Sequence, residues 1–258
     1  MRTHKAGVLT AQVGALALAT LAACSSSTPA ADNGDAATCD PCDDGGGGTM
    51  TTAGHDANPE GVAYPSPAGG YGHLPRSGNT PGSIIQNFKF LGYINGDMSQ
   101  PLTTISLADY YDPCNKRYKV LHLSVAALWC QPCNQETDAV VADLNASTSV
   151  LKGDGVVFLQ ALDDGPTEGV PADQSNLQYW ITKHSSNFTE MLDPELKNLG
   201  GFFVAAAIPW NSDIDVRTME MLDSSEGWAG DVGSEVQPGL SALPAMPSFP
   251  LPAGVTCN

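Results

Sequence analysis

Basic residues are scarce in this chain of 258 residues, which has 11 Lys and Arg against 28 Asp and Glu and a formal net charge of −17. Nucleic-acid binding and charge-driven binding to anionic lipid both need clustered positive charge, so the composition argues against both kinds of partner. A second long apolar run is missing after the first 23 residues, and the sequence therefore predicts no transmembrane anchor. Internal repeats are also missing, which is consistent with a single folded domain.

The first 23 residues combine a basic start, at Arg2 and Lys5, with a short apolar run and small residues before Cys24. This pattern predicts a secretory signal peptide over residues 1–23. The run ends in Leu-Ala-Ala-Cys, which resembles the bacterial lipobox and implies cleavage before Cys24 and acylation of its thiol. The acyl chains would hold the protein to a membrane surface. An ordinary cleaved signal with an unmodified Cys24 is the alternative.

Composition divides the remainder of the chain. Residues 24–80 are rich in Gly, Ser, Pro and Asp and contain almost no large aliphatic side chains. Such a segment cannot bury enough apolar surface to offset its ordering entropy, so we expect a disordered, flexible tether. Residues 81–243 are long enough for one folded domain with a real core, and residues 244–258 form a C-terminal tail.

Strand and helix patterns alternate along residues 81–243, which predicts an α/β fold with a sheet and helices on both of its faces. Buried strands are predicted from continuous apolar runs, and helices from apolar residues at helical spacing. The expected strands are 87–93, 119–127, 155–162 and 202–208, the hairpin is 212–222, and the helices are 134–147 and 172–188.

The stretch ALWCQPCNQE, residues 127–136, lies where the strand 119–127 gives way to a helix. A thiol at the first residue of a helix meets free backbone N–H groups and the positive end of the helix dipole, which stabilise its thiolate. Cys130 has this position, and Pro132 suits the first helical turn because no N–H is needed there. Cys133 lies one turn further on the apolar stripe. We therefore expect an exposed, reactive Cys130 and a shielded Cys133, a pairing suited to thiol–disulfide exchange.

Two neighbours of the cysteines are further candidates. Glu136 follows Cys133 by three residues, so both lie on the same side of the helix. A carboxyl group at the margin of an apolar face should have a raised pKa, and Glu136 could then exchange a proton with Cys133. A glutamate that only complements the helix dipole fits the spacing equally well. Trp129, beside Cys130, is expected to cover the disulfide.

The motif W-C-Q-P-C-N-Q-E, placed after a buried strand and at the start of a helix, resembles the thioredoxin superfamily. The glutamate three residues after the second cysteine is similar to the TlpA/ResA-like branch, which comprises extracytoplasmic, membrane-anchored thiol–disulfide oxidoreductases of bacteria. The lead-in TISLADYYD, residues 104–112, is similar to the same branch, and Ile208-Pro209 resembles the cis-proline that faces the active disulfide. Together these matches span about residues 83–224.

The resemblance implies a thioredoxin-like fold with a mixed central sheet flanked by helices. It implies that Cys130 is the nucleophile, Cys133 the resolving thiol, Glu136 a proton relay and Pro209 the residue that receives the substrate backbone. The partners would be thiols and disulfides of exported proteins, and no cofactor is expected. The location would be the periplasm or cell envelope of a Gram-negative bacterium, where Ser25 after the lipidated Cys24 favours the outer membrane over the inner one.

The chain departs from this pattern in three places. The segment 111–118 adds residues before the central strand, and the region 165–200 is long, so that Pro209 lies far from Cys133. Ser124 lies near the position at which thioredoxin has a buried aspartate. These departures leave the client and the redox potential open.

The residues leave three alternative functions open. A metal site needs two further ligands besides the two cysteines, and His122 is expected to be a core histidine with its hydrogen bonds satisfied. A peroxiredoxin-like thiol peroxidase would need a proline and a hydroxyl residue before Cys130 that residues 123–130 lack. A surface lipoprotein could also keep the fold as a binding module and use the cysteine pair only as a structural disulfide.

The cysteine count adds an expectation about pairing. Seven cysteines less Cys24 leave six, and an even number in an exported protein suggests disulfides. The simplest pairing joins Cys130 to Cys133, Cys114 to Cys257, and Cys39 to Cys42. The last pair lies in the tether, where a local structural disulfide, or none, is favoured over a second redox site.

Overall fold

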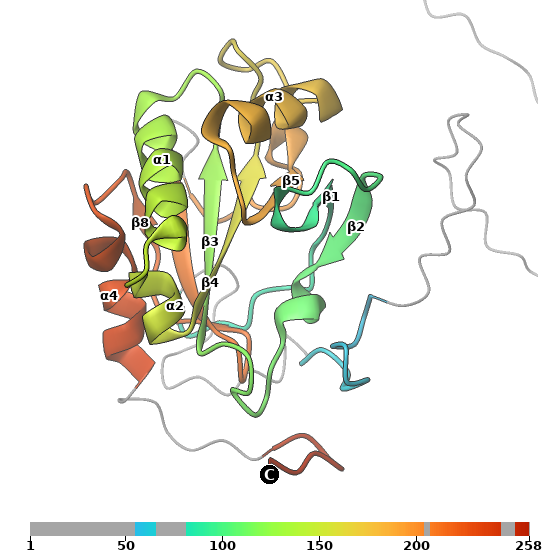
Figure 1. Ribbon diagram of the computed structural model, residues 1–258. Coiled ribbons are helices and arrows are strands. Elements are labelled where there is room, and N and C mark those ends of the chain that lie inside the picture. The colour runs from blue at the N-terminus through green and yellow to red at the C-terminus, as the bar shows by residue number, and fades with distance from the viewer. Residues whose placement is uncertain (1–54, 66–80, 204–206, 244–250, 258) are drawn as a thin grey trace, which may run out of the picture. The chain divides into compact units, whose positions relative to one another are not determined.

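The computed structural model describes residues 55–65, 81–203, 207–243 and 251–257 (Figure 1). The expected signal peptide, the lipidation position Cys24 and most of the expected tether lie outside these residues. Among the helices of the described ranges, none has the length and apolar character needed to cross a membrane.

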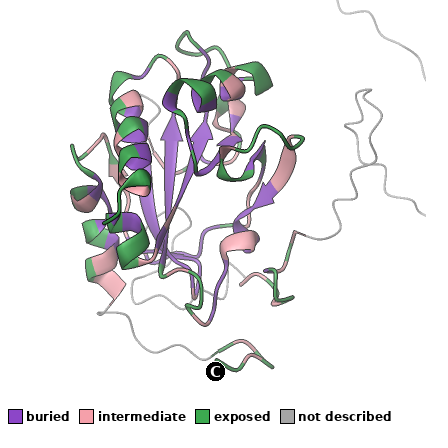
Figure 2. Cartoon of the chain, viewed as in Figure 1, coloured by how far each residue is buried: buried purple, intermediate pink, exposed green. Residues whose placement is uncertain are grey.

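A mixed sheet forms the centre of the domain, with the strand order β2-β1-β5-β4-β3-β6-β7 and with β8 paired to β6. The strands β3, β4 and β5 run parallel to one another, and every other pairing is antiparallel. The central strand β3 is buried at all of its positions, as its apolar run predicts (Figure 2). The strands are β1 (Lys89–Tyr93), β2 (Thr103–Ser106), β3 (Val120–Ala126), β4 (Val156–Leu162), β5 (Thr189–Leu192), β6 (Trp210–Asp215), β7 (Glu220–Met221) and β8 (Ser225–Glu226).

The α-helices gather on one face of this sheet, although we expected helices on both faces. Gln160 of β4 bonds to Thr137 of α1 and to Trp180 of α3, so both helices cover the face to which its side chain points. The reason is topological: β3, β4 and β5 are parallel neighbours in chain order, and right-handed crossovers place both connections on the same face. The helices are α1 (Gln131–Asn145), α2 (Val150–Asp154), α3 (Gln174–His184) and α4 (Val232–Ala242).

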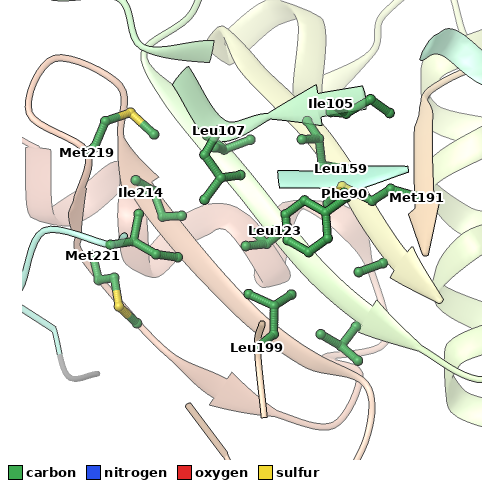
Figure 3. Close-up of a cluster of buried hydrophobic side chains, with 14 of the residues drawn as sticks. Phe90, Ile105, Leu107, Leu123, Leu159, Met191, Leu199, Ile214, Met219 and Met221 are labelled. Carbon is green, nitrogen blue, oxygen red and sulfur yellow. The ribbon is translucent and has the colours of Figure 1, made fainter. Parts of the chain in front are cut away.

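The opposite face is covered by short turns and loops rather than by α-helices. Its apolar side chains form one cluster that includes Leu123 and Leu159 from the centre of the sheet (Figure 3). Leu107 closes the cluster from the 3-10 turn η2, and Leu199 closes it from the loop after η3. The 3-10 turns are η1 (Ile94–Gly96), η2 (Leu107–Tyr110) and η3 (Pro194–Leu196).

Most of the predicted elements are present within a few residues of their expected bounds, but one predicted strand is wrong and some observed elements were not predicted. The predicted strand 202–208 is wrong, because its described residues form no strand, and the third parallel strand is β5 at residues 189–192. The helix α4 was not predicted. Its segment contains Gly233, Pro238 and Gly239, which weaken the helical signal.

Part of the expected tether packs against the domain. In residues 55–65, the Asn58 side chain donates to the backbone oxygen of Tyr111 at 3.1 Å, and the Tyr64 hydroxyl donates to that of Ile85 at 2.9 Å. The Tyr64 ring meets Tyr111 edge-on with 6.0 Å between ring centroids. The folded part therefore begins before residue 81.

The predicted disulfide between Cys114 and Cys257 is present. It joins the loop after η2 to the end of the tail across 143 positions of sequence. Because a disulfide constrains the unfolded chain, one that closes a long loop is expected to contribute noticeably to stability.

We predict that the double variant Cys114→Ser/Cys257→Ser lowers the free energy of unfolding by about 2–4 kcal/mol, the usual contribution of a native disulfide. Urea unfolding with the Cys130–Cys133 pair kept oxidised measures the difference. Peptide mapping under non-reducing conditions provides the control. Wild-type peptides that never join these two cysteines, or an unchanged unfolding midpoint, would contradict the prediction.

Candidate active site

Cys130 and Cys133 form a disulfide at the start of α1, directly after the loop that follows β3. Cys130 is the residue that caps the helix, and the backbone N–H of Cys133 donates to its Sγ at 3.1 Å. Pro132 lies in the first turn, as predicted. The same N–H group is in place to stabilise a thiolate at Cys130 once the disulfide is reduced.

The disulfide lies against the start of β6. The peptide bond between Ile208 and Pro209 is cis, as the resemblance implies, and the Sγ atom of Cys130 is 3.5 Å from the carbonyl oxygen of Ile208. Residues separated by 78 positions are thus in contact at this point.

The expected exposure of Cys130 is wrong for the oxidised protein. Its exposed fraction is 2%, and that of Cys133 is 0%. Both cysteines belong to an apolar cluster with Ala126, Ala127 and Leu177, and Ile208 packs on the same cluster. A sulfur that caps the helix and touches the Ile208 carbonyl has little surface left for water.

Trp129 lies at the surface beside this pair, with 37% of its area exposed. Its indole Nε1–H donates to Oδ2 of Asp164, just after β4, at 3.0 Å. A recess of about 340 Å³ opens next to the ring, and its lining includes Asp163, Asp164 and Glu168. Burial and the neighbouring Asp164 raise the pKa of Asp163 to about 7. Trp129 therefore borders an acidic recess, and its role as a cover of the disulfide stays a prediction.

Asn134 holds the loop that carries Cys130 through hydrogen bonds to its backbone. Its side-chain Nδ2 donates to the backbone oxygen of Cys130 at 2.6 Å and to that of Leu128 at 3.4 Å. Lys183 of α3 donates in turn to Oδ1 of Asn134. These contacts tie the first turn of α1 to α3 and hold the backbone around Cys130 in place.

Glu136 lies one turn after Cys133 and is completely buried between α1 and the sheet. Its Oε2 accepts a hydrogen bond from Ser124 of β3 at 2.8 Å and one from Gln160 of β4 at 3.4 Å. Burial raises the pKa of Glu136 to about 7, although the charge on His122 and the Ser124 hydrogen bond act to lower it. The raised pKa predicted from the sequence is confirmed. At neutral pH this group can give or take a proton.

His122 is the buried histidine that the sequence predicts, and its ring nitrogens have partners. Its Nδ1 is 2.8 Å from Oδ1 of Asp213 of β6, and its Nε2 is 3.3 Å from Oδ1 of Asn211. Burial disfavours the imidazolium, but the Asp213 carboxylate outweighs it and raises the pKa of His122 to about 9. His122 is therefore a buried cation close to Glu136.

The sequence did not point to several residues of this site. Asn134 binds the backbone of Cys130, and Asp164 binds the indole of Trp129 beside it. Three further residues lie around Glu136 and His122, namely Asn211, Asp213 and Glu235. One signal was available: the strand WNSDID contains Asn211 and Asp213 on alternate positions, which indicates a face that meets polar partners.

No family model matches the sequence, and no curated protein matches it. Solved structures do match. A secreted disulfide oxidoreductase of Mycobacterium tuberculosis has 13% identity and a TM-score of 0.40, with 61% of this chain and 96% of that chain covered.

Two further similar structures come from other bacteria. A secreted thiol-disulfide isomerase of Corynebacterium glutamicum has 17% identity and a TM-score of 0.44, with 62% of this chain and 86% of that chain covered. The exposed lipoprotein thioredoxin Etrx1 of Streptococcus pneumoniae has 19% identity and a TM-score of 0.42, with 60% and 98% covered. The strand order β4-β3-β6-β7, the disulfide at the start of α1 and the cis-proline before β6 make the fold of this chain thioredoxin-like.

Proposed function

We propose that this protein is an extracytoplasmic thiol–disulfide oxidoreductase of the TlpA/ResA-like type that exchanges disulfides with exported proteins. One observation carries the proposal: the Cys130–Cys133 disulfide lies at the start of α1 with its Cys130 sulfur against the Ile208 carbonyl, beside the cis-proline. In this arrangement the helix start can stabilise a thiolate at Cys130. The backbone at Ile208 and Pro209 lies beside it, where an extended client peptide can pair with it.

In the reducing direction, the thiolate of Cys130 attacks a client disulfide. A bond forms between Cys130 and one client sulfur, and the other client sulfur leaves as a thiolate. The Cys133 N–H group, 3.1 Å from the Cys130 sulfur in the oxidised protein, stabilises the attacking thiolate.

Cys133 resolves the mixed disulfide. It loses its proton to the carboxylate of Glu136, attacks the Cys130 sulfur and releases the second client thiolate. Two electrons pass to the client, and the Cys130–Cys133 disulfide is restored. Glu136 suits this step because burial brings its pKa to about 7, close to the pH at which the protein would work.

Pro209 and Trp129 would position the client. The carbonyl group before Pro209 faces Cys130, and the missing N–H of proline leaves this backbone edge free of a competing donor. The exposed face of Trp129 and the acidic recess beside it offer a surface for residues that flank the client disulfide.

Anchoring would keep the domain at the cell envelope. Acylation of Cys24 would fix the chain to a membrane, with the outer membrane favoured, and the Gly- and Ser-rich residues that follow would let the domain reach its clients. Neither part lies within the described residues.

A second function is supported by the burial of Cys130. An exposed fraction of 2% would also suit a structural disulfide in a surface-anchored binding module. The two functions differ in whether the disulfide opens in the presence of thiols.

We predict that Cys130→Ser abolishes disulfide exchange with a model protein disulfide. Cys133→Ser should still attack but should accumulate a mixed disulfide through Cys130, because the resolving thiol is missing. Thiol alkylation followed by mass spectrometry measures both species. The variant Cys114→Ser/Cys257→Ser is the control, since it removes the other described disulfide and should retain exchange. Turnover by Cys130→Ser would exclude the proposed mechanism.

We predict that Glu136→Gln slows resolution of the mixed disulfide by about 10²-fold above pH 7, as is typical for the loss of a positioned proton acceptor. The wild-type rate should rise with pH through the pKa of Glu136, about 7, because only the carboxylate accepts the Cys133 proton. Below that pH the two proteins should converge. The matched control is Glu60→Gln, an exposed glutamate on the segment 55–65. Identical pH profiles for wild type and Glu136→Gln would remove Glu136 from the mechanism.

We predict that Cys24→Ser moves the protein from the membrane fraction to the soluble fraction after expression in a bacterium with a lipoprotein pathway. Without a thiol at this position, acyl chains cannot be attached. Fractionation and the mass of the N-terminal peptide measure the outcome. Equal membrane association of both proteins would show that Cys24 does not anchor the chain.

A further inference from the structure

Glu136 has no contact with solvent. The exchange chemistry gives it a proton from Cys133 but does not say how that proton leaves. The exposed fraction of Glu136 is 0%, and its Oε2 partners Ser124 and Gln160 are also at 0%. A carboxyl group that takes a proton from Cys133 must lose it again before the next cycle. Ser124 and Gln160 are neutral and buried, so they offer the proton no acid–base group on the way out.

The other side of Glu136 faces titratable groups from three elements. A carboxyl oxygen of Glu136, a ring nitrogen of His122 and a carboxyl oxygen of Glu235 from α4 all lie within 4.8 Å of one another. Among the described residues, the Oε1 atom of Glu136 has no hydrogen-bond partner. The remaining charged group here is Asp213, which binds His122 on the side away from Asn211.

Glu235 is the least buried member of this group. Its exposed fraction is 7%, compared with 1% for His122 and 2% for Asp213. It lies in the first turn of α4, where its Oε2 accepts a hydrogen bond from the backbone N–H of Ala229 at 2.8 Å. Burial raises the pKa of Glu235 too, and the charge on His122 acts to lower it.

The helix α4 is held close to this cluster by a specific contact. The N–H group of Gly239 donates to Oδ2 of Asp213 at 3.0 Å. A Cβ atom at position 239 would collide with the Asp213 side chain, so only glycine permits this approach. The contact leaves Asp213 bonded on both oxygens, which fixes His122 beside Glu136 and Glu235.

We infer that Glu235 of the last helix is the outer end of a proton path that leads from Glu136, through the His122–Asp213 pair, to the surface. This inference rests on the proposed function. The His122 imidazolium passes its Nε2 proton to the Glu235 carboxylate and takes the proton of Glu136 in its place. The net change is one proton moved from Glu136 to Glu235, which then releases it to water. Each proton that Cys133 gives up thus leaves without opening the core.

The test follows the two steps of exchange separately, with the reduced full-length protein and glutathione disulfide as the probe. We expect Glu235→Gln to leave both the formation and the resolution of the Cys130–glutathione mixed disulfide unchanged, and to slow the release of the Cys133 proton to a pH indicator at least about tenfold above pH 7. A positioned acid–base group usually raises the rate of a proton-transfer step by about 10²–10⁴-fold. Glu235 would act through such a group, Glu136, so we expect a smaller effect. Glu60→Gln is again the matched control.

A conservative variant separates proton transfer from structure. Glutamine at position 235 keeps an oxygen for the Ala229 N–H but cannot take a proton, whereas aspartate keeps the carboxyl group on a shorter side chain. We expect Glu235→Asp to release the proton faster than Glu235→Gln. If Glu235→Gln releases it at the wild-type rate, or if Glu235→Asp releases it more slowly than Glu235→Gln, Glu235 carries no proton and the inference is overturned.

A second readout does not depend on disulfide exchange. At a pH where Glu136 is protonated, its carboxyl band in the infrared spectrum shifts on transfer to D₂O, and Glu136→Gln identifies that band by subtraction. We expect the shift to be at least about tenfold slower in Glu235→Gln than in wild type. Equal rates would overturn the proton path. Loss of exchange chemistry in wild type, with this difference in rates retained, would instead refute only the proposed function.

Discussion

A carboxyl group with no exposed surface is the constraint around which this domain is arranged. Glu136 lies between α1 and the sheet with no exposed surface, and a buried ionisable group is costly unless its neighbours are polar. The strand β3 would otherwise be apolar on both faces, yet it presents Ser124 and His122 to the side of α1. Asn211 and Asp213 are their cross-strand partners on β6. The helix face of the sheet is therefore polar at its centre, and the opposite face carries the large apolar cluster.

The same constraint makes the two sulfurs of the disulfide chemically different. Cys130 caps the helix and lies against the Ile208 carbonyl, so its surroundings are backbone N–H and C=O groups. Cys133 lies one turn inside, on the side of α1 that carries Glu136. One sulfur is thus surrounded by backbone polar groups, and the other lies on the side of the helix that carries a buried carboxyl group. The fold brings both settings together from β3, α1 and β6.

Much of this could be predicted from local sequence. The apolar runs of β3 and β4, the Cys-Gln-Pro-Cys motif and the spacing of Glu136 are short-range signals, and each leads to the element or the pKa shift that the structure has. The failures are long-range. The strand β5 is recognisable only through its neighbours β1 and β4, the helix α4 has weak propensity, and the burial of Cys130 depends on Ile208, far along the chain. The charge environment of Glu136 required β6 and α4 to be placed in space.

The central claim is that the Cys130–Cys133 disulfide opens and closes in exchange with other thiols. Its most direct test is a redox titration of the full-length protein, in which alkylation and mass spectrometry follow Cys130 and Cys133 separately from the remaining cysteines. The account predicts a reversible two-electron midpoint between about −270 mV, typical of thioredoxin, and about −120 mV, typical of strong oxidants of exported proteins. A pair that stays oxidised throughout this span would be a structural disulfide and would contradict the account.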